Sequence, residues 1–290
     1  MSFPASAIES GLDARISDLV AAGSVEISPR ELHRAKDVAA QLPAGSCVYI
    51  PSLPGLPLAR TLEAIAAIRE AGLDPVPHVS ARRILQREEF RDFLRRAASE
   101  HGVHRVLLLG GDEPRPKGPF ADSLQILEER LLADCGVREI GIAGYPEGHP
   151  RIALNALESA FARKLELAQA QSIGVYVLTQ FSFAPSRVVD YCASLARRWP
   201  SVPVYVGIAG PTDPVALLRY AQRCGVSLSL RALRNLGSGI AQLVTNTDPQ
   251  DQLVAVARYT LKREPSNVVG VHLYSFGGAV RTAAWMSERL

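Results

Sequence analysis

Polar side chains follow the ends of a series of short apolar segments in this sequence. Glu26 and Asp112 are carboxylates, Gln180 is an amide, and several other members of the set are histidines or tyrosines. The full set is Glu26, Pro51-Ser52, His78, Gly110-Gly111-Asp112, Tyr145 through His149, Thr179-Gln180, Gly207, His272 and Tyr274. Carboxyl groups supply general acid or base chemistry, and ligand pockets combine aromatic walls with a few orienting polar groups. We therefore expect this set to bind a polar heterocycle rather than a bare phosphate.

Most of these residues also have a purely structural explanation. A carboxylate can pair with an arginine, and a Gly-Gly-Asp sequence can form only a turn. A single histidine is more often buried or capping than a ligand, and a lysine between charged neighbours can lie on a solvated helix face. These explanations apply to Glu26, Gly110-Gly111-Asp112, His78, His149 and Lys164. Gln180 is harder to explain in this way, because a buried amide needs hydrogen-bond partners.

The segments that position these residues are eight short runs rich in Val, Ile and Leu. Their hydrophobicity is nearly continuous rather than alternating, which is typical of parallel strands covered on both faces. The runs cover residues 24–28, 47–51, 75–80, 105–111, 139–145, 175–181, 202–209 and 268–276. In a barrel of parallel strands the active site lies at the carboxyl ends of the strands. The polar residues would then converge on one mouth.

Longer helical patterns separate the runs, for example at residues 56–71, 81–101, 121–133 and 152–171. This alternation predicts parallel βαβ units, and eight of them in 290 residues predict an α/β fold, a single-domain (β/α)8 TIM barrel. We expect residues 24–290 to form the barrel and residues 1–23 a helical extension. Residues 225–261 hold two helical patterns without a strand, so we place both between strands seven and eight. Helix starts are expected at Ser28-Pro29-Arg30-Glu31, Asp213-Pro214 and Asp248-Pro249.

Composition excludes several classes of protein. Hydrophobic residues make up 47% and charged residues 21%, and the net charge of +3 comes from interspersed rather than clustered charges, so no nucleic-acid partner is expected. The four cysteines, Cys47, Cys135, Cys192 and Cys224, have no metal-binding or disulfide spacing. No apolar run approaches the roughly 20 residues that span a bilayer, and the first 15 residues lack a signal pattern. We expect a soluble, cytoplasmic protein without a membrane or metal partner.

The familiar cofactor and catalytic motifs are also missing from the sequence. There is no GxGxxG after a strand, no P-loop, no HExxH and no nucleophile elbow. A nicotinamide nucleotide bound in a Rossmann domain is therefore not expected. Any redox cofactor must be held by the mouth of the barrel itself.

At these same segment ends the sequence resembles the methylenetetrahydrofolate reductase family. The longest matching motif is Gly141-Ile-Ala-Gly-Tyr-Pro-Glu-Gly-His-Pro150, followed by Leu109-Gly-Gly-Asp-Glu-Pro114 and Leu178-Thr-Gln-Phe-Ser-Phe183. Shorter matches are Val25-Glu-Ile-Ser-Pro29, Pro77-His-Val-Ser80, Val206-Gly-Ile208 and Val271-His-Leu-Tyr274. They occur in the family's order over almost the whole chain.

The resemblance implies an FAD-dependent oxidoreductase that interconverts 5,10-methylenetetrahydrofolate and 5-methyltetrahydrofolate, with NADH or NADPH as electron donor. It assigns Glu26 as general acid, Asp112 as the carboxylate that contacts the pterin and tunes the flavin, and Gln180 as the amide that binds the folate. Tyr274 is assigned to both folate and cofactor. The positions implied for FAD binding are His78, Gly110, Gly111, Asp112, Phe120, Ala121, Ala143, Tyr145, His149, Lys164 and Tyr274.

The sequence also departs from the family's pattern. Gly110 stands where the family has an arginine, Ser275-Phe-Gly-Gly278 replaces Thr-Leu-Asn-Arg, Ser182 replaces an aromatic residue, and strand two ends in Tyr49-Ile-Pro-Ser-Leu-Pro-Gly55. These changes leave open a divergent flavin- or folate-binding barrel with another substrate or little turnover, and the same reaction run oxidatively.

A barrel lyase that uses a Schiff-base lysine is disfavoured, because no lysine lies at an expected strand end. The resemblance also implies a homo-oligomer. The apolar residues Leu228, Leu230 and Leu233 either support that assembly or belong to the core.

Overall fold

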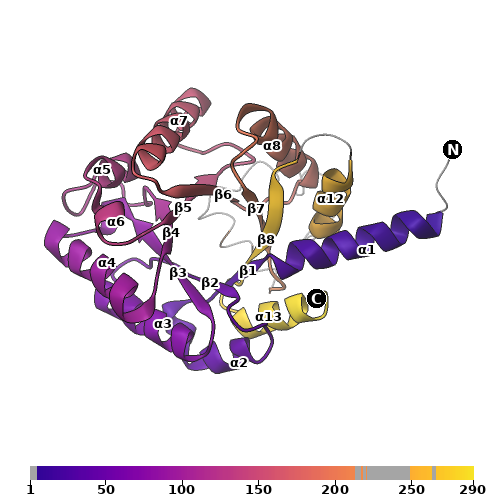
Figure 1. The fold of residues 1–290 in the computed structure, drawn as a ribbon, viewed down its shortest axis with the longest axis horizontal. Coiled ribbons are helices and arrows are strands. Elements are labelled where there is room, and N and C mark those ends of the chain that lie inside the picture. Colours follow the sequence, from indigo (N-terminus) through magenta and orange to yellow (C-terminus); the bar gives the residue numbers. More distant parts are fainter. Residues whose placement is uncertain (1–4, 213–216, 218–219, 221–248, 263–265) are drawn as a thin grey trace. The chain divides into compact units, whose positions relative to one another are not determined.

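The computed structural model describes residues 5–212, 217, 220, 249–262 and 266–290. Eight parallel strands close into a barrel in the order of the chain, from β1 to β8, with helices flanking them (Figure 1). The strands are Ser24–Glu26, Cys47–Ile50, Asp74–Ser80, Arg105–Leu109, Glu139–Gly144, Gly174–Thr179, Val204–Ala209 and Val268–Tyr274. Each of the eight predicted runs therefore forms a strand, although most strands end one or two residues before the apolar run does. The (β/α)8 prediction is confirmed.

The chain divides into two compact units, each of which has its own internal packing. One unit comprises residues 27–143 and 151–177, and the other comprises residues 1–26, 144–150 and 178–290. In the first unit, β2 pairs with β3 (Tyr49 opposite Val76), β3 with β4, and β4 with β5. In the second unit, β8 pairs with β1 and with β7.

The helices of the first unit differ from the predicted ones at two places. The pattern at 81–101 forms a short 3-10 helix, η2 (Ala81–Arg83), and then α4 (Arg87–His101), with extended backbone between them. The pattern at 121–133 forms α5 (Ser123–Glu128) and α6 (Leu131–Asp134), because Arg130 between them takes a left-handed conformation with φ 58°. Asp122 caps α5 by accepting from the backbone of Leu124 and Gln125. At the first break, the Lys117 N–H of a distant loop donates to the Arg82 carbonyl at 2.9 Å.

The remaining helices of this unit follow the prediction closely. Helix α3 (Leu58–Glu70) turns five side chains into the core, and α7 (Leu154–Ala170) follows β5. The expected helix start after Ser28 is present as a 3-10 helix, η1 (Pro29–Arg34), followed by the short α2 (Ala35–Ala39). The Ser28 hydroxyl accepts from the Arg30 backbone, which is the capping role expected of it.

A pair of tyrosines fills part of the interior of the first unit. The Tyr49 hydroxyl donates to the Tyr176 hydroxyl at 2.8 Å, and both side chains are buried. A Cβ atom on Gly141 would lie 2.6 Å from Tyr176 Cζ, so only glycine leaves room for that ring. The Arg105 guanidinium lies over the Tyr176 ring and pairs with Glu139 at 2.5 Å. The first glycine of the long family motif thus has a packing role.

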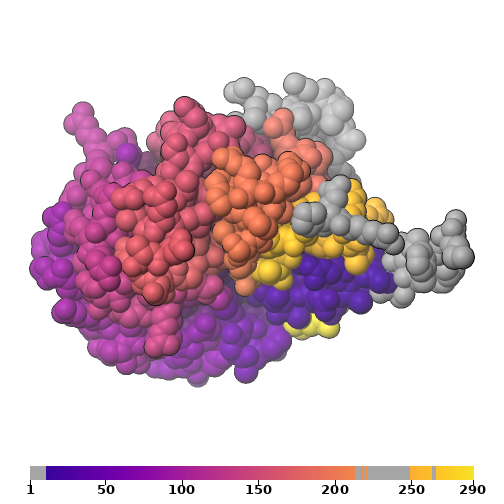
Figure 2. All heavy atoms as spheres, turned by 45° about the horizontal axis from the view of Figure 1, so that its top comes forward, coloured from indigo at the N-terminus to yellow at the C-terminus, as the bar shows by residue number. Residues whose placement is uncertain are grey.

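In the second unit, α1 (Ala5–Ala21) precedes the first strand and packs against α12 (Pro249–Leu261), as the ribbon and space-filling views both show (Figures 1 and 2). Arg15 fixes it by donating to the Thr260 hydroxyl and the Val268 carbonyl. The other helices of this unit are α8 (Pro185–Arg198) and α13 (Ala279–Ser287). Helix α12 begins at Pro249, as expected. Asp213-Pro214, the other helical pattern of 225–261, Cys224 and the leucines at 228, 230 and 233 lie outside the described residues.

Over the part of the chain that the structure describes, no helix is long and apolar enough to cross a membrane. Within the same residues, Cys47, Cys135 and Cys192 are free thiols. Burial raises the pKa of the Cys192 thiol to about 12, so this thiol stays protonated and unreactive at neutral pH.

Candidate functional site

His78 lies near the carboxyl end of β3 with its ring edge-on to Tyr49, at 6.0 Å between ring centroids. Its Nε2 atom is buried and has no hydrogen-bond partner among the described residues. Burial, and then the nearby Arg83 cation, lower the pKa of His78 to about 3, so the imidazole is neutral at physiological pH. A buried nitrogen without a partner is rare in folded proteins and is expected where a ligand supplies the partner.

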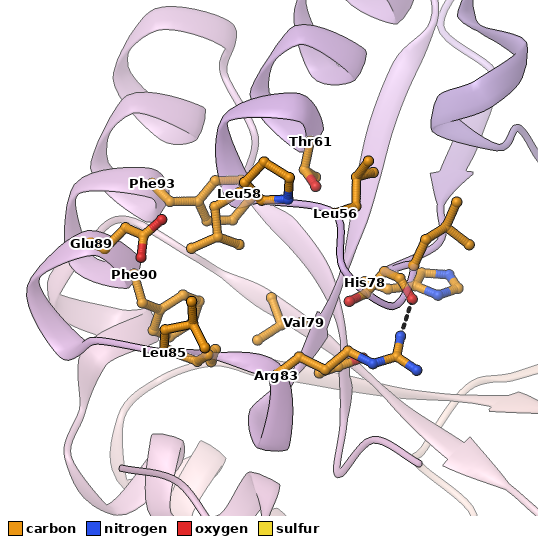
Figure 3. Close-up of a pocket in the computed structure, with 15 residues that line it drawn as sticks. Leu56, Leu58, Thr61, His78, Val79, Arg83, Leu85, Glu89, Phe90 and Phe93 are labelled. Carbon is orange, nitrogen blue, oxygen red and sulfur yellow. Dashed lines mark hydrogen bonds between the residues drawn. The ribbon is translucent and has the colours of Figure 1, made fainter. Parts of the chain in front are cut away.

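Figure 3 shows the pocket that His78 borders, with α3 on one side and η2 and α4 on the other. Most of its wall is apolar, including Leu56, Leu58, Val79, Leu85 and Phe90. At the His78 end, Arg83 donates to the backbone carbonyl of Ser52 and pairs with Glu113 at 3.3 Å. The pocket therefore has one polar end, built from the segments that follow β2, β3 and β4.

The Gly110-Gly111-Asp112 turn follows β4. Gly111 has φ +94°, which favours glycine, and a Cβ atom there would meet Ser80 at 3.5 Å. Around Gly110, by contrast, there is open space within 4 Å of a Cβ position. The Asp112 side chain is 80% exposed, and its only described ion pair is a loose one to Arg151 at 3.9 Å. The turn leaves a carboxylate accessible to a ligand.

The loop between Asp112 and α5 is braced by Arg82. Its guanidinium donates to the carbonyls of Ala121 at 2.7 Å and Glu113 at 3.0 Å. Gly118 lies so close to the carbonyls of Ile84 and Leu85 that a Cβ atom would overlap them. The Arg82-Arg83 doublet is visible in the sequence as a basic spot, but its bracing role is not.

Phe120 and Ala121, both expected to bind cofactor, have limited freedom to do so. The Phe120 ring is fully buried against Phe90 and beneath Arg87, so the ring is not available to a ligand. The Ala121 carbonyl accepts from Arg82, and its N–H donates to the Gln125 side chain. The Ala121 methyl group is therefore the part of this residue that remains available to contact a cofactor.

Lys164 lies on α7 and is partly buried. Burial lowers its pKa to about 8, and the Asp122 carboxylate acts in the opposite direction. No hydrogen bond or ion pair of the Lys164 ammonium occurs among the described residues. A poorly solvated cation of this kind favours an anionic ligand. Ala143, also expected at the cofactor, is half-buried near the end of β5.

In the other unit, Tyr145 and His149 belong to the turn that follows β5. Their rings meet edge to face with centroids 5.0 Å apart. The turn closes with a hydrogen bond from the Gly148 N–H to the Tyr145 carbonyl at 2.9 Å, and Gly148 has φ +77°. A hydrogen bond between Tyr191 of α8 and the Tyr145 backbone links the turn to that helix. Sequence reasoning did not identify Tyr191.

Gln180 directly follows β6. Its backbone N–H donates to the Gly144 carbonyl at 2.8 Å, and its side-chain oxygen accepts from the Phe181 N–H at 3.1 Å. Because the amide oxygen is used locally, the NH2 group is the part of the side chain left to bind a ligand. Glu26 is the last residue of β1 and is half-buried.

Tyr274 is the last residue of β8, and its position is fixed by a hydrogen bond of its hydroxyl and by packing of its ring. Its hydroxyl donates to the Thr179 carbonyl at 3.0 Å, and the ring lies so close to Gly207 that a Cβ atom there would approach it to 2.7 Å. Phe181 and Phe276 pack against it with centroids 5.8 and 6.1 Å away. Phe181, which follows Gln180 in the chain, is the buried member of this apolar cluster.

Among the described residues, no group of three or more His, Cys, Asp and Glu side chains could hold a metal ion. In the unit that holds β2 to β4, the unpartnered His78 nitrogen and the poorly solvated Lys164 cation could hold a polar, anionic ligand.

Comparisons with known proteins agree with this picture at the level of family. A family model described as methylenetetrahydrofolate reductase matches residues 55–276. Methylenetetrahydrofolate reductase 2 of Saccharomyces cerevisiae is 26% identical over 142 residues, covering 45% of this chain and 23% of the yeast protein. The chain thus aligns with about a quarter of that relative.

Two solved structures are similar to the chain in outline. Dihydropteroate synthase (FolP) from Thermus thermophilus has a TM-score of 0.47 at 17% identity and 92% coverage of both chains. The OMP decarboxylase of Leishmania donovani has a TM-score of 0.45 at 10% identity, covering 97% of this chain and 94% of its own. Since both scores are under 0.5, the fold assignment rests on the strand order alone.

Proposed function

The chain belongs to the methylenetetrahydrofolate reductase family, and from this premise we propose that it is a flavin-dependent oxidoreductase of folate one-carbon units. The reaction is the interconversion of 5,10-methylenetetrahydrofolate and 5-methyltetrahydrofolate, with NADH or NADPH as the electron donor. The observation that carries the proposal is the family match over residues 55–276, which includes Asp112 and Gln180. Glu26 lies outside that match, so its role rests on its place at the end of β1.

The proposed cofactor is FAD. His78, Gly111 and Lys164 would hold it in the unit that contains β2 to β4, and the resemblance to the family adds Tyr145 and His149 to the proposed cofactor residues. Lys164 supplies positive charge for a phosphate, and the neutral His78 ring offers its buried nitrogen to a polar atom. The chemistry that bound FAD would supply is hydride transfer between the nicotinamide donor and the folate.

The acid chemistry is assigned to Glu26. Reduction of the one-carbon unit requires the five-membered ring of the substrate to open, and the nitrogen released by that opening needs a proton. A carboxylic acid at the end of β1 can supply the proton, and general acid assistance is typically worth about 10² to 10⁴ in rate. Gln180 would donate a hydrogen bond from its NH2 group to the pterin. The exposed Asp112 carboxylate would accept a hydrogen bond from the pterin.

The test is stopped-flow kinetics with the two half-reactions measured separately. Glu26→Gln is expected to leave flavin reduction by the nicotinamide donor unchanged and to slow reoxidation by methylenetetrahydrofolate by at least about 10². Asp112→Asn is the comparison variant and is expected to weaken folate binding and alter the flavin potential. Reoxidation of Glu26→Gln at the wild-type rate would show that Glu26 is not the acid.

The identity of the cofactor is tested by releasing it from the purified protein and running it on chromatography against FAD and FMN. FMN, or no flavin after reconstitution, contradicts the FAD proposal. Gly110 stands where the family has an arginine, and this departure favours a second candidate, a barrel that binds flavin or folate with little turnover. A protein that binds FAD and is reduced by NADH or NADPH, yet is not reoxidised by the folate, supports this candidate instead.

A further inference from the structure

Thr179, the last residue of β6, is fully buried and is bonded to both of the strands that come after it in the chain. Its hydroxyl oxygen accepts a hydrogen bond from the Gly207 N–H of β7 at 2.9 Å, and its carbonyl oxygen accepts one from the Tyr274 hydroxyl of β8 at 3.0 Å. All three residues belong to the same compact unit. Thr179 therefore uses its side chain and its backbone to join β7 and β8 to β6.

The bond between Tyr274 and Thr179 depends on the absence of a side chain at Gly207. A Cβ atom at Gly207 would overlap the Thr179 carbonyl oxygen and would lie 2.7 Å from Tyr274 Cε2. Phe181 packs against the same tyrosine ring, with 5.8 Å between the ring centroids. The Tyr274 ring is thus held by its hydroxyl and by contacts along its side, so that its orientation depends on where Thr179 and Gly207 lie.

The peptide group between Thr179 and Gln180 is held at both of its ends. Its carbonyl oxygen is the acceptor for Tyr274, and its N–H donates to the Gly144 carbonyl at the end of β5 at 2.8 Å. A peptide group is planar, so these two hydrogen bonds fix its plane and with it the position of the Gln180 Cα atom. The same peptide therefore sets where the Gln180 side chain begins and where the Tyr274 ring ends.

We propose that Thr179 is a positioning residue that sets the orientations of Gln180 and Tyr274 together. This inference deepens the proposed function and rests on it, because the family resemblance assigns those two residues to the folate. Thr179 is fully buried, so it has no surface to offer a ligand and acts through its two neighbours. Its hydroxyl holds β7 at Gly207, which keeps the Thr179 carbonyl within reach of Tyr274.

The experiment is calorimetric titration of the full-length protein with 5-methyltetrahydrofolate, which needs no turnover. Thr179→Val keeps the shape of the side chain but removes the acceptor of the Gly207 N–H. It should raise the dissociation constant by about twofold to tenfold, the range expected for one net hydrogen bond. Thr179→Ser keeps the hydroxyl and should restore the wild-type affinity.

A double-mutant cycle separates positioning from a general loss of stability. In a Tyr274→Phe background the tyrosine no longer bonds to the Thr179 carbonyl, so adding Thr179→Val should change the dissociation constant by a smaller factor than it does in wild type. Thr260→Val on α12 is the matched control, because it also removes a threonine hydroxyl that accepts an N–H, that of Arg15 Nε at 2.9 Å. The control should bind 5-methyltetrahydrofolate as wild type does.

An unchanged dissociation constant in Thr179→Val overturns the positioning role, and so does an equal factor in the two backgrounds or a Thr179→Ser protein that binds as weakly as Thr179→Val. Weakening of the same size in Thr260→Val also contradicts it, because the effect would then be one of stability. A wild-type protein that does not bind 5-methyltetrahydrofolate contradicts the proposed function, and the inference falls with it. A wild type that binds the folate, with Thr179→Val indistinguishable from it, contradicts the inference alone.

Discussion

The substitution Gly207→Ala tests the packing of β7 against Tyr274. A Cβ atom at this position would lie 2.7 Å from Tyr274 Cε2 and would overlap the Thr179 carbonyl oxygen. Carbon atoms in contact prefer a separation of about 3.5 to 4.0 Å, so the ring must move by roughly 1 Å. The carbonyl belongs to the strand backbone and cannot turn aside as a flexible side chain would. Gly207 also lies opposite His272 in the pairing of β7 with β8, so a shift there disturbs the sheet.

The size of the effect follows from these contacts. Overpacking in a well-packed core costs about 1 to 3 kcal/mol. The displacement also disturbs two hydrogen bonds, from the Gly207 N–H to the Thr179 hydroxyl at 2.9 Å and from the Tyr274 hydroxyl to the Thr179 carbonyl at 3.0 Å, each worth about 1 kcal/mol. Alanine restricts the unfolded chain and offsets about 0.4 to 1 kcal/mol of this loss. The expected net loss in the free energy of unfolding is roughly 2 to 4 kcal/mol.

Equilibrium unfolding in urea, followed by circular dichroism, measures this loss. Gly110→Ala is the matched control, because Gly110 also lies at a strand end, has an ordinary φ and has open space around its Cβ position. Its free energy of unfolding should stay within about 0.5 kcal/mol of wild type, apart from the same unfolded-state gain. A Gly207→Ala protein as stable as Gly110→Ala would refute the assigned packing of Tyr274 over β7.

Three further predictions concern buried polar groups. The folded-state pKa of His78, about 3, is lower than its unfolded value of about 6.5, so His78 has no effect on the pH dependence of stability above pH 6.5 and lowers the free energy of unfolding by about 1.4 kcal/mol per pH unit as the pH falls from 6.5 towards 3. His78→Gln should flatten that slope in urea unfolding, and an unchanged slope would contradict the burial of His78. Tyr176→Phe removes the acceptor of the Tyr49 hydroxyl and should cost about 1 to 3 kcal/mol, and adding Tyr49→Phe should cost less than the sum, whereas strict additivity would argue against the pair. Asp122→Asn keeps an N-cap acceptor for α5 but removes the negative charge near Lys164. The pKa of Lys164 should therefore fall below about 8 in an NMR titration, and a rise would show that Asp122 is not the electrostatic neighbour of Lys164.

The strands and their order could be predicted from the sequence because each strand is buried on both faces and therefore appears as an uninterrupted apolar run. The run at 139–145, for example, corresponds to β5 at Glu139–Gly144. The patterns at 81–101 and 121–133 did not show their breaks. The break after Arg83 lies where a distant loop donates to the Arg82 carbonyl, and local periodicity is insensitive to such contacts. The left-handed conformation of Arg130 is likewise invisible to the apolar pattern.

The strand-end positions of Glu26, Asp112 and Gln180 likewise follow from the sequence, since topology alone brings a residue after a strand to the end of the barrel. Where each side chain points was decided by tertiary packing. Phe120 turns into the core, and Gln180 uses its amide oxygen within its own loop. The Thr282 hydroxyl faces Gly210 without a partner among the described residues. A residue's type and spacing encode its burial and its element, but its direction and its partners come from segments far away in the chain, which meet only when the barrel closes.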